Sequence, residues 1–83
     1  MNRRVLISAQ GQADLAALDR SVGARLAGAI LRFAQTGAGS VKALHGFHPP
    51  QFRLRVGDWR VRFHDHGDSI EILRVTHRKD AYQ

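Results

Sequence analysis

The stretch Gln51-Phe-Arg-Leu-Arg-Val-Gly-Asp-Trp-Arg-Val-Arg-Phe63 decides the fold, because it predicts two short strands joined by a tight turn. Gly57 and Asp58 are typical of a two-residue hairpin turn when apolar and polar residues alternate on both sides. Folding the stretch about this turn predicts the pairs Val56–Trp59, Arg55–Arg60, Leu54–Val61, Arg53–Arg62 and Phe52–Phe63. Directly opposed residues share a face of a β-ribbon, so one face should be apolar and the other should carry four arginines.

The four arginines of this ribbon indicate a polyanionic partner. Like charges that face each other across a ladder weaken a sheet, so a chain that keeps them has a use for them. The alternative is that they are solvated surface residues. The chain has 13 basic and 7 acidic residues, and eleven of the basic residues are arginine. Because guanidinium is a planar fork that suits phosphate, this balance favours nucleic acid or an acidic protein over a membrane.

Length and composition limit the possible classes of protein. Eighty-three residues predict one domain, residues 1–83. The absence of cysteine excludes disulfides and thiolate metal sites and suits a reducing cytoplasm. No apolar run approaches the roughly 20 residues that span a bilayer, and the first residues do not form a signal peptide. We therefore expect a cytoplasmic protein with no membrane partner.

The N-terminal half predicts a strand followed by two helices. Residues 3–9 predict a strand that Gly11 breaks, and residues 12–19 predict a helix with Asp14 in its first turn. Ser21 is a good N-cap for a second helix. The apolar stripe of that helix is Val22, Leu26, Ile30 and Phe33. The two helices should form a hairpin, because the connection between them is very short.

The segments that flank the ribbon complete an α+β fold. Residues 41–46 predict a link, and residues 69–76 predict a further strand after a turn at residues 65–68. In the simplest register Glu71 faces Arg62, which gives that arginine a structural partner. The order is then an N-terminal strand, a two-helix hairpin and an antiparallel β-meander in two layers. The helices should cover the apolar face, and the arginine face should be open to solvent.

His64 and His66 lie two residues apart at the turn and could in principle bind a metal ion. The sequence suggests no third ligand near them. We therefore expect no metal site and no cofactor.

Four motifs resemble the RelE/ParE superfamily of toxins from bacterial type II toxin–antitoxin systems. They are Asp14-Leu-x-x-Leu18, Val41-Lys-x-Leu-x-Gly46, the ribbon from Phe52 to Val61, and Val75-x-His-Arg-x-x-x-Tyr82. Each motif alone is weak, but together and in this order they cover nearly the whole chain. The resemblance implies the α+β fold described above and an acidic antitoxin as partner.

The resemblance leaves three functions open. RelE-type members cut mRNA in the A site of the ribosome, whereas ParE-type members inhibit DNA gyrase and are not nucleases. An inert chain that only binds its antitoxin is the third possibility. The nuclease residues of the family correspond here to Arg53, Arg55, Arg60, Arg78 and Tyr82. This match favours the nuclease, although the segment from Ile72 to Val75 followed by His77 also resembles the gyrase-inhibiting branch.

For a nuclease, the resemblance implies metal-free attack of the RNA 2′-hydroxyl on the adjacent phosphate. We expect Arg60 and Arg78 to stabilise the charge of the transition state. Arg53 and Arg55 would bind RNA but cannot act as bases, because arginine does not lose its proton. The proton transfers then fall to His77 or Tyr82, and Tyr82 could instead stack on a base.

Overall fold

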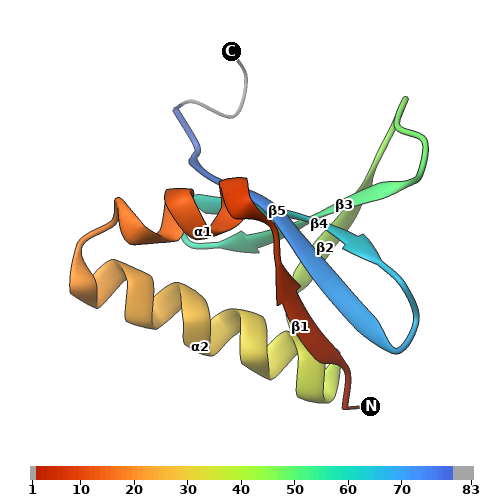
Figure 1. Cartoon of the computed structure of the whole chain (residues 1–83), viewed down its shortest axis with the longest axis horizontal. Helices are drawn as coiled ribbons and strands as arrows, with labels where there is room; N and C mark the ends of the chain where they lie inside the picture. Colours follow the sequence, from red (N-terminus) through yellow and green to blue (C-terminus); the bar gives the residue numbers. More distant parts are fainter. Residues whose placement is uncertain (1, 80–83) are drawn as a thin grey trace.

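The structure, a computed structural model, describes residues 2–79 and consists of one sheet with two helices packed on one face (Figure 1). Its elements are β1 (Arg4–Ile7), α1 (Ala9–Ala16), α2 (Arg20–Thr36), β2 (Ser40–Leu44), β3 (Gln51–Val56), β4 (Trp59–Asp65) and β5 (Ser69–His77). The strand order is β1-β5-β4-β3-β2, in which β1 runs parallel to β5 and the other neighbours are antiparallel. The predicted α+β order of strand, helix hairpin and meander is confirmed. Within residues 2–79, neither helix is long and apolar enough to cross a membrane.

The β3–β4 ribbon has the register that the sequence predicts at all five pairs, from Phe52–Phe63 at one end to Val56–Trp59 at the turn. Its apolar face is buried under α2. The core consists of Leu26, Ile30, Phe33, Ala34, Leu54, Val61, Phe63, Ile70, Ile72 and Val75. Three of the four residues in the predicted stripe of α2 are therefore buried, and the fourth, Val22, packs against the core from its edge.

The first helix begins three residues earlier than predicted. Ser8 is its N-cap and accepts a hydrogen bond from the backbone N–H of Gly11. Gly11 does not break the strand but lies buried inside α1. A Cβ at this position would be 2.9 Å from the carbonyl oxygen of Ile72. Glycine is required here because the helix backbone lies directly on β5. The second helix also starts earlier, with Asp19 rather than Ser21 at its N-cap.

We expect the Gly11→Ala substitution to destabilise the protein by about 1–3 kcal/mol, because the added methyl forces α1 away from β5. Gly28→Ala in α2 is the matched control, because a Cβ there meets no atom within 4 Å. That substitution should stabilise the protein by up to about 1 kcal/mol, since alanine is the better helix former. Urea unfolding of both variants measures the two effects. Equal changes in stability would contradict the close contact at Gly11.

The segment predicted as a link contains strand β2, which pairs with β3 at the edge of the sheet. Val41 faces Leu54 and Lys42 faces Arg53. The prediction was wrong because most residues of this strand are exposed to solvent. Residue preferences in strands depend largely on burial and packing, so an exposed strand is difficult to recognise from its residues. Its pairing with β3 places a fifth basic residue, Lys42, beside the arginines of the ribbon.

The predicted pair between Glu71 and Arg62 is wrong, because the β4–β5 turn is tighter than the turn predicted at residues 65–68. Asp65 pairs with Ile70, the His66 N–H donates to the Ser69 carbonyl, and a β-bulge after Arg62 shifts the register once more. Arg62 faces Arg74, and Glu71 faces His64. Arg62 still has structural partners. Its guanidinium donates a 2.7 Å hydrogen bond to Gln51 Oε1 and lies 4.9 Å from the centre of the Phe47 ring.

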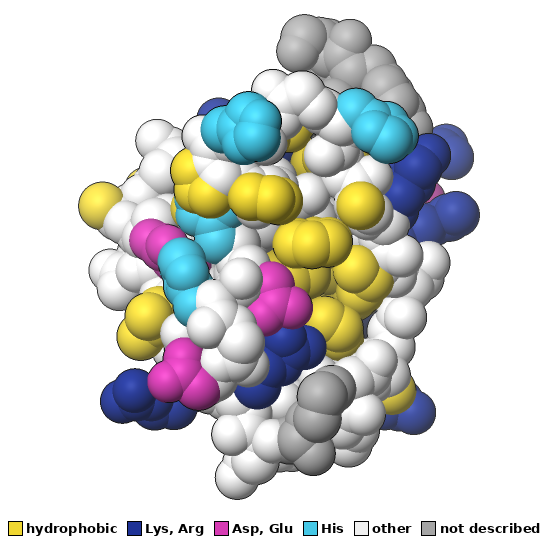
Figure 2. All heavy atoms as spheres, turned by 90° about the vertical axis from the view of Figure 1, so that its right-hand side faces the viewer, with side chains coloured by type: hydrophobic (Ala, Val, Ile, Leu, Met, Phe, Trp, Pro, Cys, Tyr) yellow, Lys and Arg dark blue, Asp and Glu magenta, His cyan; other side chains and the backbone are white. Residues whose placement is uncertain are grey.

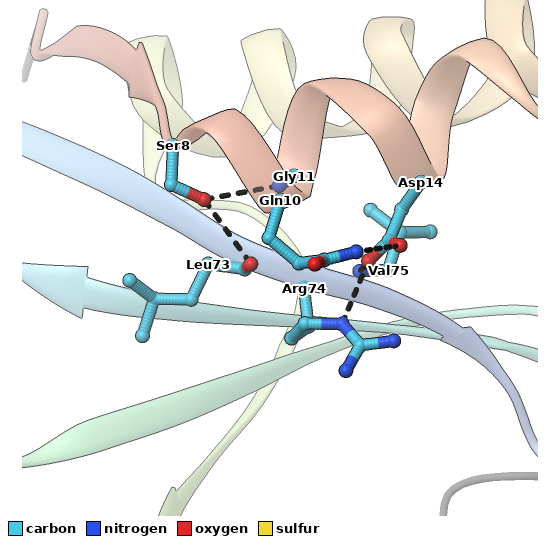
Figure 3. A network of polar contacts seen from close by, with 7 residues as sticks. All are labelled: Ser8, Gln10, Gly11, Asp14, Leu73, Arg74 and Val75. Atoms are coloured by element: carbon cyan, nitrogen blue, oxygen red, sulfur yellow. Dashed lines mark hydrogen bonds and ion pairs between the residues drawn. The ribbon is translucent and has the colours of Figure 1, made fainter.

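Polar groups of α1 continue the hydrogen bonding along the edge of β5 where β1 ends (Figure 3). The Ser8 N–H donates to the carbonyl of Ile72, and its hydroxyl donates to the carbonyl of Leu73. Asp14 Oδ2 accepts from the N–H of Val75 at 2.8 Å and from Arg74 Nε at 2.9 Å. Asp14 therefore closes the open edge of the strand and does not serve the helix dipole as predicted.

Acid should weaken this edge contact. Burial raises the pKa of Asp14, but hydrogen bonds from Val75 N–H, Arg74 and Gln10 outweigh it and lower that pKa. A carboxyl whose pKa is lowered by folding contributes stability above its unfolded pKa of about 3.9 and loses it as pH falls through the folded value. We therefore expect the free energy of unfolding to fall less steeply with acidification in Asp14→Asn than in the unsubstituted protein.

Urea unfolding across a series of acidic pH values measures this difference. Asp68→Asn, on the β4–β5 turn, is the control, because its side chain takes no part in the contacts of α1 with β5. Identical pH profiles for Asp14→Asn and the unsubstituted protein would contradict the role given to Asp14.

Candidate nucleic-acid interface

Cross-strand pairing brings basic residues from three strands onto the face of the sheet that the helices leave uncovered. Lys42, Arg53 and Arg62 lie directly across from one another on β2, β3 and β4. Arg55 and Arg60 form a second row next to them. We call these five residues the basic face. The sequence predicts its four arginines but not Lys42, although the alternation of Lys42 with Val41 and Ala43 was a signal for an edge strand.

The residues of the basic face are not equally available. Arg55 is exposed and Arg53 is half-buried, so both side chains are accessible from the solvent. Arg62 is held by the contacts already described. Arg60 is only 7% exposed, and its Nη1 donates to the carbonyls of Gly57 and Trp59 at 3.1 Å each. The open position expected for Arg60 is therefore not found, and its guanidinium instead ties together the β3–β4 turn.

Arg78 lies at the same end of the sheet as this turn. Its backbone N–H donates to the carbonyl of Asp58 at 2.7 Å. Its side chain is 59% exposed, and its Nε lies 3.8 Å from Asp58 Oδ1. Exposed ion pairs of this kind contribute little stability. The Arg78 guanidinium is thus free to exchange the Asp58 carboxylate for another anion.

His77 lies on the other face of the sheet. It is paired with Trp59, whose side chain belongs to the apolar face of the ribbon, and its ring packs edge-on against the indole at 5.1 Å. His77 Nδ1 accepts a 3.3 Å hydrogen bond from the N–H of Lys79. The structure therefore does not bring His77 onto the basic face with Arg60. Tyr82, the other predicted proton-transfer residue, lies outside the described residues.

A groove of about 450 Å³ lies between α2 and β3. Its lining residues are Gly28, Ala29, Arg32, Ala38, Gly39, Leu54, Arg55 and Val56. Arg25 of α2 lies close by, since a Cβ on Gly57 would be 2.6 Å from its guanidinium. The groove is therefore apolar at its base and has arginines from both a helix and a strand. The sequence did not indicate it, because its two walls are distant along the chain.

Comparison with known proteins identifies the family. Residues 5–82 match the family described as "ParE toxin of type II toxin-antitoxin system, parDE". Toxin RelE3 of Methanocaldococcus jannaschii is 40% identical over 42 residues, which cover 51% of this chain and 47% of that toxin. The match thus spans about half the length of this relative.

Two crystal structures of toxin–antitoxin complexes have the same fold. The RelB-RelE complex from Methanococcus jannaschii matches with a TM-score of 0.73 and 26% identity over 93% of this chain and 94% of that one. The archaeal RelE-RelB complex from Pyrococcus horikoshii OT3 matches with a TM-score of 0.75 and 26% identity over 98% and 100% of the two chains. The chain therefore belongs to the ParE toxin family of type II toxin–antitoxin systems, within the RelE/ParE superfamily, and the relatives compared above are RelE toxins.

Proposed function

We propose that this chain is a toxin that cuts mRNA in the ribosomal A site and so inhibits translation. The observation that carries the proposal is the basic face next to the exposed Arg78, because it offers several guanidinium groups to one phosphate backbone. The RelE-like relatives support the same activity. Lys42, Arg53 and Arg55 bind the RNA phosphates, which positions the strand without selecting its sequence.

The reaction needs no metal ion. The RNA 2′-oxygen loses its proton and forms a bond to the adjacent phosphorus, while the bond from phosphorus to the 5′-oxygen breaks. The departing 5′-oxygen takes up a proton, which leaves a 2′,3′-cyclic phosphate and a 5′-hydroxyl. Arg78 stabilises the extra negative charge on the phosphate oxygens in the transition state. Arginines can hold that charge but cannot accept the proton.

Arg60 and His77 take more limited roles than the sequence suggests. Arg60 stabilises the β3–β4 turn instead of contacting the RNA, since its Nη1 donates to two carbonyls of that turn and its side chain is nearly inaccessible. His77 accepts a hydrogen bond at Nδ1, so its Nε2 carries the proton in the neutral ring. To protonate the 5′-oxygen, His77 would act in its imidazolium form, with both ring nitrogens protonated, at the end of the sheet where β5 stops. Tyr82 remains the alternative for the proton transfers.

An acidic antitoxin is the partner of the chain in this proposal. The two similar RelE chains were solved with RelB, and this chain has a net charge of +6. The α2–β3 groove fits an antitoxin segment with apolar side chains for Ala29, Leu54 and Val56 and acidic ones for Arg32 and Arg55. Because Arg55 belongs to both the groove and the basic face, a bound antitoxin would also block RNA.

Inhibition of DNA gyrase without nuclease activity is the second candidate. The match of residues 5–82 to the ParE toxin family favours it. The burial of Arg60 and the position of His77 on the opposite face also count toward it, since both reduce the number of groups near a scissile phosphate.

Controlled expression of the chain separates these functions. Mapping of mRNA 5′ ends should reveal cuts in phase with codons, and gyrase supercoiling activity should stay unchanged. Blocked supercoiling with intact mRNA would instead establish the gyrase inhibitor. If neither activity is found and growth is unaffected, the chain is an inert partner that only binds its antitoxin.

A further inference from the structure

The β4–β5 turn brings three metal-binding side chains together at the end of the sheet opposite the β3–β4 turn, on the side of the molecule where histidine and acidic side chains lie next to one another (Figure 2). His64 and His66 come from β4 and the turn, and Glu71 comes from β5. Their ligand atoms all lie within 4.8 Å of one another. Glu71 is the third ligand that the sequence did not suggest, because the expected register placed it opposite Arg62. The tighter turn places it opposite His64 instead.

We propose that His64, His66 and Glu71 form a binding site for a zinc-class transition-metal ion. Glu71 Oε1 lies 3.1 Å from His66 Nε2 and 3.6 Å from His64 Nδ1. Ligands about 2.0–2.1 Å from a tetrahedral zinc ion are about 3.4 Å apart, so two of the three ligand separations are already close to that value. The ligand nitrogens of the two histidines lie within 4.8 Å of each other, so the two rings must approach more closely to complete the set.

Contacts around the turn fix its backbone and engage the neighbouring charged side chains, which leaves the three ligands available to a metal ion. The His66 N–H donates to the carbonyl of Ser69, which closes the turn. Asp65 lies between the histidines in sequence, but it is bound by Arg3 and by the N–H of Gly67. Arg62, which precedes the histidines on β4, is directed to Gln51 and Phe47. No lysine or arginine among residues 2–79 therefore makes an ion pair with Glu71.

The chemistry of the ligands selects the metal. A glutamate side chain is ionised at neutral pH, so Glu71 offers a carboxylate beside the two imidazoles. Two imidazoles and one carboxylate suit zinc and related ions, and they leave a fourth position for water. Magnesium and calcium prefer oxygen ligands only and should not bind. Bound metal would join β4 to β5 across their turn, well away from Arg78.

Titration of the purified, untagged chain with zinc against a chromogenic chelator tests the proposal. We expect one zinc ion per chain and no competition from magnesium. His66→Ala and Glu71→Gln should each weaken zinc binding by more than the about 10–100-fold that loss of an outer-shell partner costs. Both replaced side chains are partly exposed, His66 by 45%, so the variants should fold normally, which circular dichroism checks.

His48→Ala is the matched control, because this exposed histidine lies on the loop between β2 and β3. It should bind zinc as the unsubstituted chain does. Cobalt should give the intense visible absorption of a tetrahedral site, and it should lose that absorption in His66→Ala. Absence of saturable zinc binding, or binding that His66→Ala and Glu71→Gln leave unchanged, would overturn the proposal. Either result is independent of whether the chain cuts RNA.

Discussion

Replacing Arg78 by alanine should lower the rate of mRNA cleavage by about 10²–10³, the usual cost of removing one donor that stabilises a transition-state charge. The side chain is 59% exposed and its one ion pair, among residues 2–79, is the 3.8 Å contact with Asp58. Its loss should therefore leave the fold and the melting temperature unchanged. A rate measurement with ribosomes, together with a thermal melt, separates an effect on chemistry from an effect on stability.

Two further variants make the Arg78 result specific. Arg4→Ala removes the same charge from β1, where Arg4 is paired with Ser69 at the far end of β5, and should leave the rate unchanged. Arg78→Lys keeps the charge but loses the fork that binds two phosphate oxygens, and should recover only part of the rate. Equal losses in Arg4→Ala and Arg78→Ala would mean that only the overall charge matters.

Replacing Phe63 by alanine should remove about 3–5 kcal/mol of stability, which is the usual cost for a buried aromatic residue. Phe63 is 1% exposed and lies between two other rings, with centres 5.3 Å from Phe33 and 5.7 Å from Phe52. It thus joins α2 to the β3–β4 ribbon. Because small domains have only about 5–15 kcal/mol in total, we expect a large fraction of the variant to be unfolded at 37 °C.

Urea unfolding measures the Phe63 effect against an exposed control. Leu31→Ala on the outer side of α2 should change the stability by less than about 0.5 kcal/mol, since that side chain is 51% exposed. Phe63→Leu, which leaves a smaller cavity, should fall between the two. A Phe63→Ala variant as stable as Leu31→Ala would show that the three rings do not form the centre of the core.

The features that depend on local sequence were predictable. The two-residue turn at Gly57 and Asp58 fixed the register of the ribbon, and the helical spacing of Leu26, Ile30 and Phe33 identified the buried side of α2. Both follow from rules that act over a few residues. The resemblance to the RelE/ParE superfamily also depended on such short motifs, and the family match confirms it.

The predictions that were wrong concern contacts between distant parts of the chain. From the sequence alone Gly11 is expected to end a strand, but its place in α1 is set by the nearby carbonyl of Ile72. The tight β4–β5 turn placed Glu71 opposite His64 rather than Arg62, and the bulge after Arg62 shifted the register once more. The sequence predicted which arginines share the basic face. The burial of Arg60 and the position of His77 could be predicted only with the register of three strands known.

Cleavage of a defined mRNA on purified ribosomes tests the proposed function most directly. Ribosomes are stalled with a known codon in the A site, the purified chain is added, and both new RNA ends are identified by mass spectrometry. The proposal predicts a cut within that codon, a 5′-hydroxyl on one fragment, a cyclic phosphate or its opened product on the other, and loss of the cut in Arg78→Ala. Intact mRNA, together with inhibition of gyrase supercoiling by the same preparation, would contradict it.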